Sequence, residues 1–295
     1  MEKLLQWAVN NSDQEALKKQ AEAIRKGEAQ ADPSKFDPAI IEAILGKDDA
    51  TRMKEAVECI VDPKDTLENK EIALDNLEML IEGIDNANNI ENMKLWPSIL
   101  SQLTTEEAAI RKGIAWVCGT AMQNNPKAQE AFLANNGLEK LVELLKTEQN
   151  KQVKATVIYA VSGLLKHSPK AQEAFGEKGG FEALFDIVKP TSEPTILRKT
   201  IFLFNSLLIE NKQFGTKLLE QGGLKDLGAV LAKYTEDDED DEDMVEKTLR
   251  TSHTLITETK ATIPAEFKQY AQKAADKFGK ENLNMAESEW ILLLA

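Results

Sequence analysis

The heptapeptide PKAQEAF occupies residues 126–132 and recurs letter for letter at residues 169–175, an offset of 43 residues. A glycine followed by an apolar residue comes shortly after each copy, and further steps of 43 residues in both directions reach other apolar residues. The four apolar residues at this spacing are Leu95, Leu138, Phe181 and Leu224, here called the period markers. A fixed period between about 20 and 50 residues is typical of stacked structural repeats. The sequence therefore predicts a repeat protein.

A short apolar segment and then a longer one follow the markers. The short segments are residues 96–103, 139–145, 182–188 and 225–231. The long segments begin at Glu106, Gln149 and Glu193, and their apolar residues have the i, i+3, i+4, i+7 spacing of an amphipathic helix. Two further copies begin at Glu68 and Asp241. A middle helix that ends at the marker completes the unit.

A short, a middle and a long helix in each period resemble the armadillo repeat. We predict an all-α fold, a right-handed armadillo-type helical solenoid whose long helices line the concave side, preceded by a flexible amino-terminal segment. Gly113, Gly119 and Gly163 lie inside the long helices. Glycine there costs about 1 kcal/mol relative to alanine, so its presence indicates close packing between helices.

Composition along the chain predicts four parts. Residues 1–37 form the amino-terminal segment and a linker, because residues 26–38 are polar and interrupted by proline. Residues 38–233 form the repeat body. Residues 234–243, YTEDDEDDED, form an acidic loop that charge repulsion keeps open. Residues 244–295 form a last repeat, and the apolar ending EWILLLA caps it.

The charge balance favours a protein partner. Lys plus Arg number 36 and Asp plus Glu 50, and a net charge of −14 argues against binding to nucleic acid or to an anionic membrane. No apolar run approaches the roughly 20 residues that span a bilayer. We therefore expect a soluble intracellular protein.

Signs of catalysis are missing from the sequence. There are two histidines, and no GxxxxGK[ST], GxGxxG after a strand, HExxH or GxSxG motif occurs. Cys59 and Cys118 have no second thiol or histidine at ligand spacing. We expect no enzyme activity, no metal and no cofactor.

Two segments carry a more specific resemblance. Residues 1–7, MEKLLQW, and residues 75–96, which include DNLEMLIE and DNANNIEN, closely resemble the fungal Fes-type nucleotide-exchange factors, which belong with the HspBP proteins of animals. The resemblance implies a cytoplasmic, monomeric co-chaperone that binds the nucleotide-binding domain of a 70-kDa heat-shock chaperone. In that family the concave face embraces one lobe of this domain, so that ADP leaves. The amino-terminal segment assists release of the chaperone's client.

The resemblance also suggests site residues. Asp85, Asn86, Ala87, Asn88 and Asn89, at the end of a long helix, match a family contact region, and Arg198 matches a basic contact. Helix capping is the alternative for the asparagines. Trp116, Tyr159 and Phe202 occupy equivalent positions in three long helices and form either an aromatic stripe in the groove or packing between repeats. Leu4, Leu5 and Trp7 form the apolar cluster of the client-release segment, or dock on the first repeat.

Two other functions are compatible with an armadillo-type fold. Nuclear-import carriers of the armadillo class pair each Trp with an Asn one turn later, whereas this chain has Thr120, Gly163 and Ser206 at those places. A protein-binding scaffold without exchange activity is the main alternative.

Overall fold

The structure is a computed structural model that describes residues 13–27, 46–236 and 241–295. Every regular element in these ranges is a helix. The chain divides into two compact units, Met1–Glu55 and Ala56–Ala295. The boundary falls inside α4 (Asp49–Val61), later than the expected boundary after residue 37.

The first unit contains α2 (Gln14–Arg25). The Asp13 side chain begins this helix, because its Oδ1 accepts hydrogen bonds from the backbone N–H groups of Glu15 and Ala16, both at 3.1 Å. Gly27, with φ of 73°, follows the helix end. The predicted client-release residues Leu4, Leu5 and Trp7 and most of the predicted linker lie outside the described residues.

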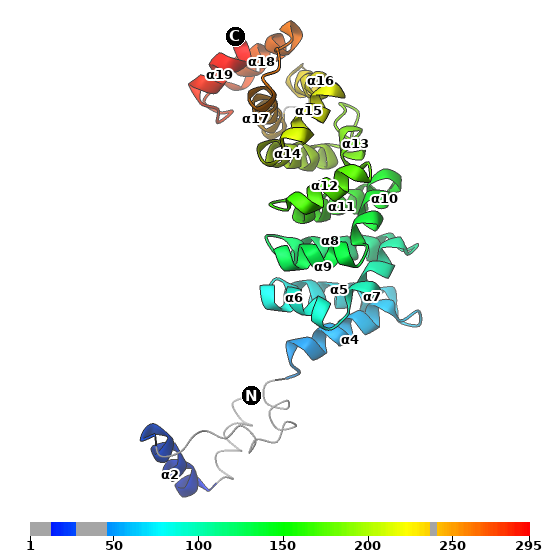
Figure 1. Cartoon of the computed structure of the whole chain (residues 1–295), viewed down its shortest axis with the longest axis vertical. Coiled ribbons are helices and arrows are strands. Elements are labelled where there is room, and N and C mark those ends of the chain that lie inside the picture. The colour runs from blue at the N-terminus through cyan, green and yellow to red at the C-terminus, as the bar shows by residue number, and fades with distance from the viewer. Residues whose placement is uncertain (1–12, 28–45, 237–240) are drawn as a thin grey trace. The chain divides into compact units, whose positions relative to one another are not determined.

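The second unit repeats a long helix, a middle helix of 9 residues and the helix predicted to be short, which has 6 to 14 residues (Figure 1). The long helices are α5 (Leu67–Ile81), α8 (Ala108–Met122), α11 (Lys151–Leu165), α14 (Pro194–Glu210) and α17 (Glu242–Thr259). The middle helices are α6 (Ile84–Asn92), α9 (Pro126–Ala134), α12 (Pro169–Glu177) and α15 (Lys212–Glu220). The short helices are α7 (Trp96–Ser101) with the 3-10 turn η2 (Gln102–Thr104), α10 (Gly137–Thr147), α13 (Gly180–Phe185) and α16 (Gly223–Glu236).

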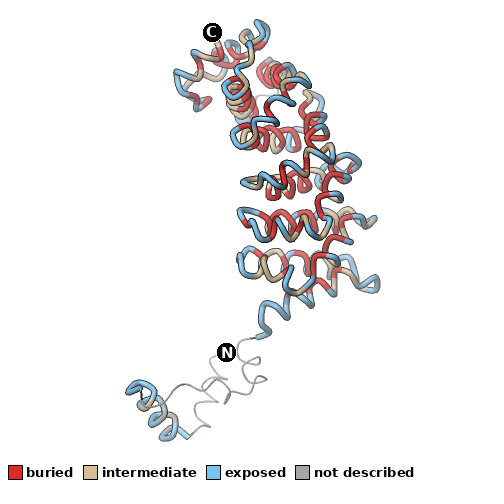
Figure 2. Tube along the Cα trace, in the orientation of Figure 1, coloured by how far each residue is buried: buried red, intermediate tan, exposed pale blue. Residues whose placement is uncertain are grey.

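The long helices stack in chain order. Helix α5 packs on α8, α8 on α11, α11 on α14, and α14 on α17. Figure 2 shows the buried residues concentrated where the helices of successive layers meet. All four period markers are buried, none more than 9% exposed. The armadillo-type architecture predicted from the period is confirmed.

The recurring heptapeptide has a packing reason. Its phenylalanine lies directly over the glycine that precedes the marker, since a Cβ at Gly137 would stand 2.5 Å from the Phe132 ring and a Cβ at Gly180 2.5 Å from the Phe175 ring. Its glutamine is buried, and Gln129 Nε2 donates to the carbonyl oxygens of Gly163 and Lys166 at 2.9 and 3.1 Å. These carbonyls end α11, so the glutamine satisfies helix-end acceptors of the next repeat.

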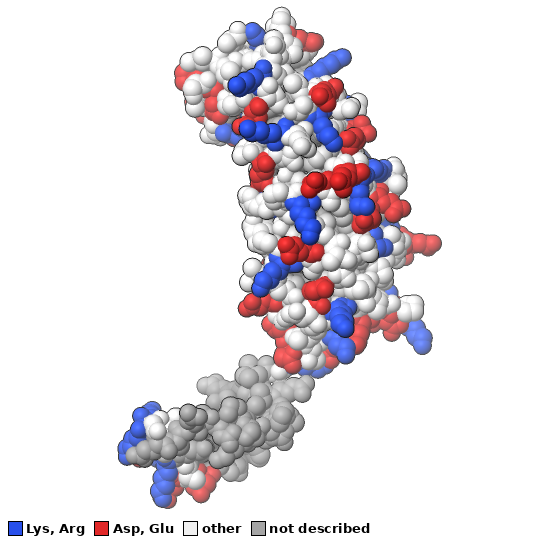
Figure 3. Space-filling view, in the orientation of Figure 1, with Lys and Arg blue, Asp and Glu red and all other residues white. Residues whose placement is uncertain are grey.

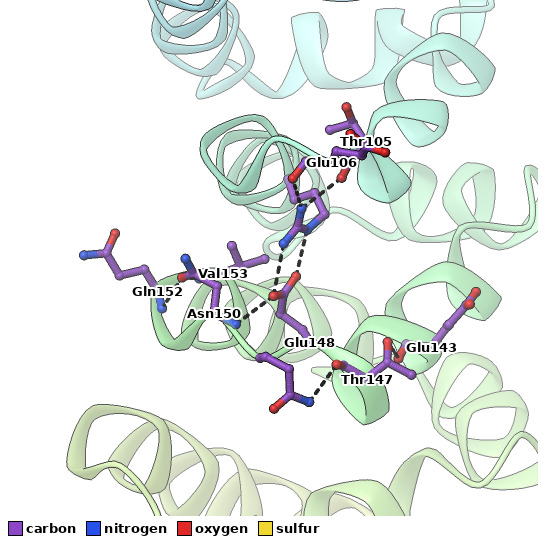
Figure 4. A network of polar contacts seen from close by, with 10 residues as sticks. Thr105, Glu106, Glu143, Thr147, Glu148, Asn150, Gln152 and Val153 are labelled. Atoms are coloured by element: carbon purple, nitrogen blue, oxygen red, sulfur yellow. Dashed lines mark hydrogen bonds and ion pairs between the residues drawn. The ribbon is translucent and has the colours of Figure 1, made fainter.

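A buried ion pair joins successive repeats in the same way (Figure 4). Glu148, between α10 and α11, accepts from Arg111 of α8 at 2.8 and 3.1 Å. It also accepts from the backbone N–H of Asn150 at 2.8 Å. Arg111 Nη1 in turn donates to the backbone carbonyls of Thr105 and Glu106 at 2.9 and 2.8 Å. The pair therefore fixes α8 against the start of α11.

The close packing predicted from the glycines is confirmed. A Cβ at Gly119 would stand 2.4 Å from the Tyr159 ring, and a Cβ at Gly163 would stand 2.8 Å from the carbonyl oxygen of Gly119. A Cβ at Gly113 would stand 2.6 Å from the Leu74 side chain. Helices α8 and α11 approach this closely because both positions lack a side chain.

The acidic loop expected at residues 234–243 is shorter than predicted. Tyr234 and Thr235 are buried in α16, which continues to Glu236, because Tyr234 belongs to the apolar side of that helix. Asp241 caps the beginning of α17, its Oδ1 accepting from the Met244 backbone N–H at 3.0 Å. Beyond α17 lie α18 (Ala265–Phe278) and α19 (Glu287–Leu294). Trp290 and Leu293 of α19 are buried, as expected for a cap.

Candidate partner-binding face

The long helices expose one continuous row of polar and aromatic side chains, here called the long-helix face. Successive members touch one another or line a shared hollow. The face comprises Glu78 of α5, Trp116, Thr120 and Gln123 at α8, Tyr159 of α11, and Lys199 and Phe202 of α14.

Glu78 joins the first two helices of this face. Its Oε1 accepts from Trp116 Nε1 at 2.8 Å and from Thr120 Oγ1 at 3.0 Å. Both donors lie on α8, one turn apart. The carboxylate therefore holds the indole in place while leaving the Trp116 side chain 44% exposed.

Tyr159 continues the row. Its ring stacks on Trp116 with centroids 5.0 Å apart and an interplanar angle of 28°. Its hydroxyl donates to Gln123 Oε1 at 3.2 Å and lies 3.3 Å from Thr120 Oγ1. On its other side Lys199 Nζ lies 5.9 Å from the ring centroid. Tyr159 is thus fixed from two sides, which pre-organises the centre of the face.

Phe202, the third of the equivalent aromatic residues, is 53% exposed. It shares with Tyr159 the wall of a hollow of about 250 Å³ between α8, α11 and α14. The hollow is lined by Gln123, Asn124, Ile158, Tyr159, Ser162, Gly163, Lys166, Lys199 and Phe202. Trp116 and Tyr159 therefore pack against each other between repeats, whereas Phe202 is exposed at the wall of the hollow.

The segment from Asp85 to Asn89 is not the end of a long helix. It lies in α6, a separate middle helix that begins after Gly83. Asn86 Nδ2 donates to the Leu80 carbonyl at 2.9 Å and so caps the preceding helix α5. Asn88 has a buried Oδ1 without a hydrogen-bond partner, and Asn89 Oδ1 accepts from Asn92 at 3.0 Å.

Ala87, expected to contact a partner, is instead buried. The residue is only 2% exposed, because α6 turns it toward the core together with Ile90. Its side chain is not available to a partner, and a larger side chain there would meet the core first. Of this segment, Asp85 is exposed and Asn86, Asn88 and Asn89 are partly exposed.

Arg198 lies on α14 as expected, but its guanidinium is already engaged. It forms ion pairs with Asp241 and, from Nε, with Asp243 Oδ2 at 2.8 Å. Both carboxylates come from the end of the acidic run at the start of α17. The Arg198 side chain keeps 32% of its exposure.

Glu78, Gln123, Lys166 and Lys199 were not anticipated as part of the face. A signal for Glu78 was present, because Glu71, Asp75, Glu78 and Glu82 follow helical spacing on one side of α5. Lys199 and Lys166 carried no such signal, since lysines are common on helix surfaces.

The described parts of the chain hold neither a membrane-spanning helix nor a cluster of candidate metal ligands. No helix there is long and apolar enough to cross a membrane. No group of three or more His, Cys, Asp or Glu side chains in those parts is arranged to hold a metal ion.

Two family models match the chain. Residues 1–90 match the model described as nucleotide exchange factor Fes1, and residues 86–236 match the SIL1/FES1/HPBP1 C-terminal domain. A protein of Schizosaccharomyces pombe named Hsp70 nucleotide exchange factor fes1 is 46% identical over 131 residues, which are 44% of this chain and 46% of the relative. The relative of the same name from Scheffersomyces stipitis is 46% identical over 167 residues, 55% of this chain and 54% of its own. The chain thus spans about half the length of the curated relatives it matches.

Solved structures agree with the fold. A designed armadillo repeat protein in complex with the peptide (KR)4 superimposes with a TM-score of 0.62 at 14% identity, covering 82% of this chain and 99% of that one. A computationally designed armadillo repeat protein for modular peptide recognition gives 0.59 at 14% identity, covering 82% and 96%. At such identities the likeness concerns the fold alone.

Proposed function

The chain belongs to the SIL1/FES1/HPBP1 family of nucleotide exchange factors, and from this membership we propose that it is a co-chaperone of a 70-kDa heat-shock chaperone, Hsp70. It binds the nucleotide-binding domain of a cytosolic Hsp70 as a monomer and promotes release of ADP. The protein itself performs no chemical step.

The observation that carries the proposal is the exposure of large apolar side chains along the long helices. Exposed apolar groups rimmed by polar residues mark protein-binding surfaces. Among the residues that the structure describes, the long helices α5, α8 and α14 expose Leu67, Ile72, Met79, Trp116, Phe202 and Ile209, each at least 41% exposed. A macromolecular partner covering the long-helix face would bury Trp116 and Phe202 of this set.

The mechanism is a shift of a conformational equilibrium. A factor that binds an open arrangement of the chaperone's lobes more tightly than the closed one increases the open population by the ratio of the two affinities. Linkage then requires that nucleotide weakens the factor's binding to the same extent. The stacked long helices suit this role, because Glu78, Tyr159 and the close contact of Gly119 with Gly163 make the face rigid.

Release of a fluorescent ADP analogue from a eukaryotic cytosolic Hsp70 tests the proposal. Catalytic amounts of the protein should accelerate the release measured by stopped flow. Superimposed traces with and without the protein would refute exchange activity. The chain would then be a scaffold, the alternative function.

The amino-terminal segment has a separate role in the proposal, assistance in client release by Leu4, Leu5 and Trp7. Deletion of residues 1–34 should leave ADP release unchanged and slow the discharge of a bound peptide client. Substitution of Leu4 and Trp7 by serine in the full chain should reproduce the defect. Equal slowing of both activities would contradict a separate role.

A nuclear-import carrier is disfavoured by the same face. In such a carrier, asparagine amides bind the peptide backbone, and the equivalent positions here are Thr120, Gly163 and Ser206. Thr120 is hydrogen-bonded to Glu78, and Gly163 is buried against α8. None of these side chains provides the paired amide donor and acceptor.

A further inference from the structure

We infer that the hollow between α8, α11 and α14 receives an acidic side chain, Asp or Glu, of the protein partner, with Lys166 and Lys199 as its counter-charges. The identity of the partner rests on the proposed function, whereas the chemistry of the hollow rests on its own residues.

The first observation is the charge of the hollow. Its lining holds two ammonium groups, Lys166 and Lys199, and, within the described parts of the chain, no carboxylate. This is unexpected in a chain with 50 acidic and 36 basic residues. On the visible surface of the second unit Lys and Arg side chains commonly lie beside Asp and Glu (Figure 3).

The second observation is that other cations of the same repeats are already paired. Arg198, next to Lys199 in sequence, binds Asp241 and Asp243, and Arg111 binds Glu148. Lys189 binds Asp226 at 2.5 Å. Neither Lys166 nor Lys199 has an ion-pair partner among the residues that the structure describes. Within the hollow itself, the positive charge available to a partner is that of these two lysines.

The third observation is the shape and polarity of the walls. Tyr159 and Phe202 supply apolar surface for the methylene groups of an acidic side chain. Ser162 and Gln123 add hydrogen-bonding groups to the lining. Lys199 lies over the Tyr159 ring and is partly buried, as is Lys166. Partial burial lowers the effective dielectric and strengthens a charge pair relative to one in open water.

The position of the hollow suits a contact that fixes how the partner is aligned along the stack of long helices. It lies in the part of the long-helix face formed by α11 and α14, where Tyr159, which stacks on Trp116, and Phe202 both line it. Charge pairs inside an apolar surround fix orientation and exclude partners of the wrong sign. An acidic side chain seated here would orient the partner along the stack of long helices.

Binding of the full chain to the nucleotide-binding domain of a cytosolic Hsp70 is the first test. Replacement of both lysines, Lys166→Gln with Lys199→Gln, should weaken binding about tenfold or more and reduce its salt dependence. Lys199→Arg should retain most of the affinity. The matched control is Lys170→Gln, an exposed lysine on α12 outside the hollow. Wild-type affinity in the folded double variant, with exchange intact, would overturn the inference and leave the proposed function standing.

A second test does not need the chaperone. The acetylated and amidated peptide Glu-Phe-Glu is titrated into the isotope-labelled full chain, with Gln-Phe-Gln as control. Only the acidic peptide should shift the backbone amide signals of residues 159–166 and 199–202, and the double variant should abolish the shifts. If the wild-type chain binds no chaperone, the proposed function fails and this titration alone decides. Absence of shifts overturns the inference.

The chain's own acidic run is the competing occupant. Substitution of Asp237, Asp238 and Asp240 by asparagine tests it in the same titration. Unchanged peptide binding supports the inference. Markedly tighter peptide binding would assign the hollow to that run in the free protein and overturn the inference.

Discussion

Removal of Arg111 should destabilise the stack of repeats substantially. Its guanidinium makes two hydrogen bonds to Glu148 and two to the backbone carbonyls of Thr105 and Glu106. The pair is largely buried, with side-chain exposures of 16% for Arg111 and 5% for Glu148. The substitution Arg111→Ala leaves the carboxylate buried with a single strong donor, the backbone N–H of Asn150.

The magnitude follows from burial. Loss of one partner of a buried pair costs about 3–5 kcal/mol, and the residual exposure of Arg111 reduces this to about 2–4 kcal/mol. Glu148→Gln keeps the size and an acceptor oxygen, so we expect a loss of about 1–2 kcal/mol. Replacement of both residues by methionine removes the cost of burying two charges. The free energy of unfolding should then stay within about 1 kcal/mol of that of the wild type.

The pH dependence has a definite sign. Burial raises the pKa of Glu148, but the hydrogen bonds from Arg111 and from the Asn150 backbone outweigh it, so the pKa lies below its ordinary value. The contribution to stability is therefore complete above the ordinary glutamate pKa of about 4.3 and is lost as the pH falls through the lower folded-state pKa. The difference in stability between the wild type and Arg111→Ala should shrink in that range.

Urea unfolding followed by circular dichroism measures these effects. The midpoint reports the change in stability, and a decrease in the slope m would report loss of cooperativity between repeats. A wild-type-like midpoint for Arg111→Ala, within about 0.5 kcal/mol, would refute the argument. A double methionine variant less stable than Arg111→Ala would refute it equally.

Three further substitutions test the packing and the face. Ala87→Arg should lower stability by more than about 3 kcal/mol, because it forces a charged side chain into the core, and a stable, well-folded variant in urea unfolding would contradict the burial of this residue. Gly163→Ala should cost about 1–3 kcal/mol through overlap with the Gly119 carbonyl. The control Gly83→Ala, whose Cβ would make only ordinary van der Waals contacts of 3.6 Å and longer, should change stability by less than about 1 kcal/mol in the same assay. Arg198→Ala should change stability by less than about 1 kcal/mol, because its ion pairs are partly exposed. The same variant should weaken chaperone binding in a titration. Unchanged affinity would exclude Arg198 as a contact.

The repeat architecture was predictable because its signals are local and recur. The 43-residue period predicts where the apolar residues of each repeat lie, and all four markers are buried in the structure. The glycines inside the long helices predicted close contacts, which Gly119 and Gly163 make. Each of these signals depends on one helix and its immediate successor.

The errors arose where a neighbouring element decides the environment of a residue. Ala87 was expected to contact a partner because its segment resembles a family contact region, yet the rotation of α6 turns it inward together with Ile90. The acidic run was expected to be open, yet Tyr234 at its start packs into the core. Local composition carries no information about such rotations.

The sequence by itself determined the long helices of the repeats, their order, the repeat class and the family, because hydrophobic periodicity and recurring motifs are properties of the chain. Only the tertiary structure decided which charges are free. Arg198 meets Asp241 and Asp243 from the next repeat, while Lys166 and Lys199 share a hollow without a carboxylate among the described residues. Ion pairing depends on distances of a few ångströms between side chains of different repeats, and those distances exist only after the repeats have stacked.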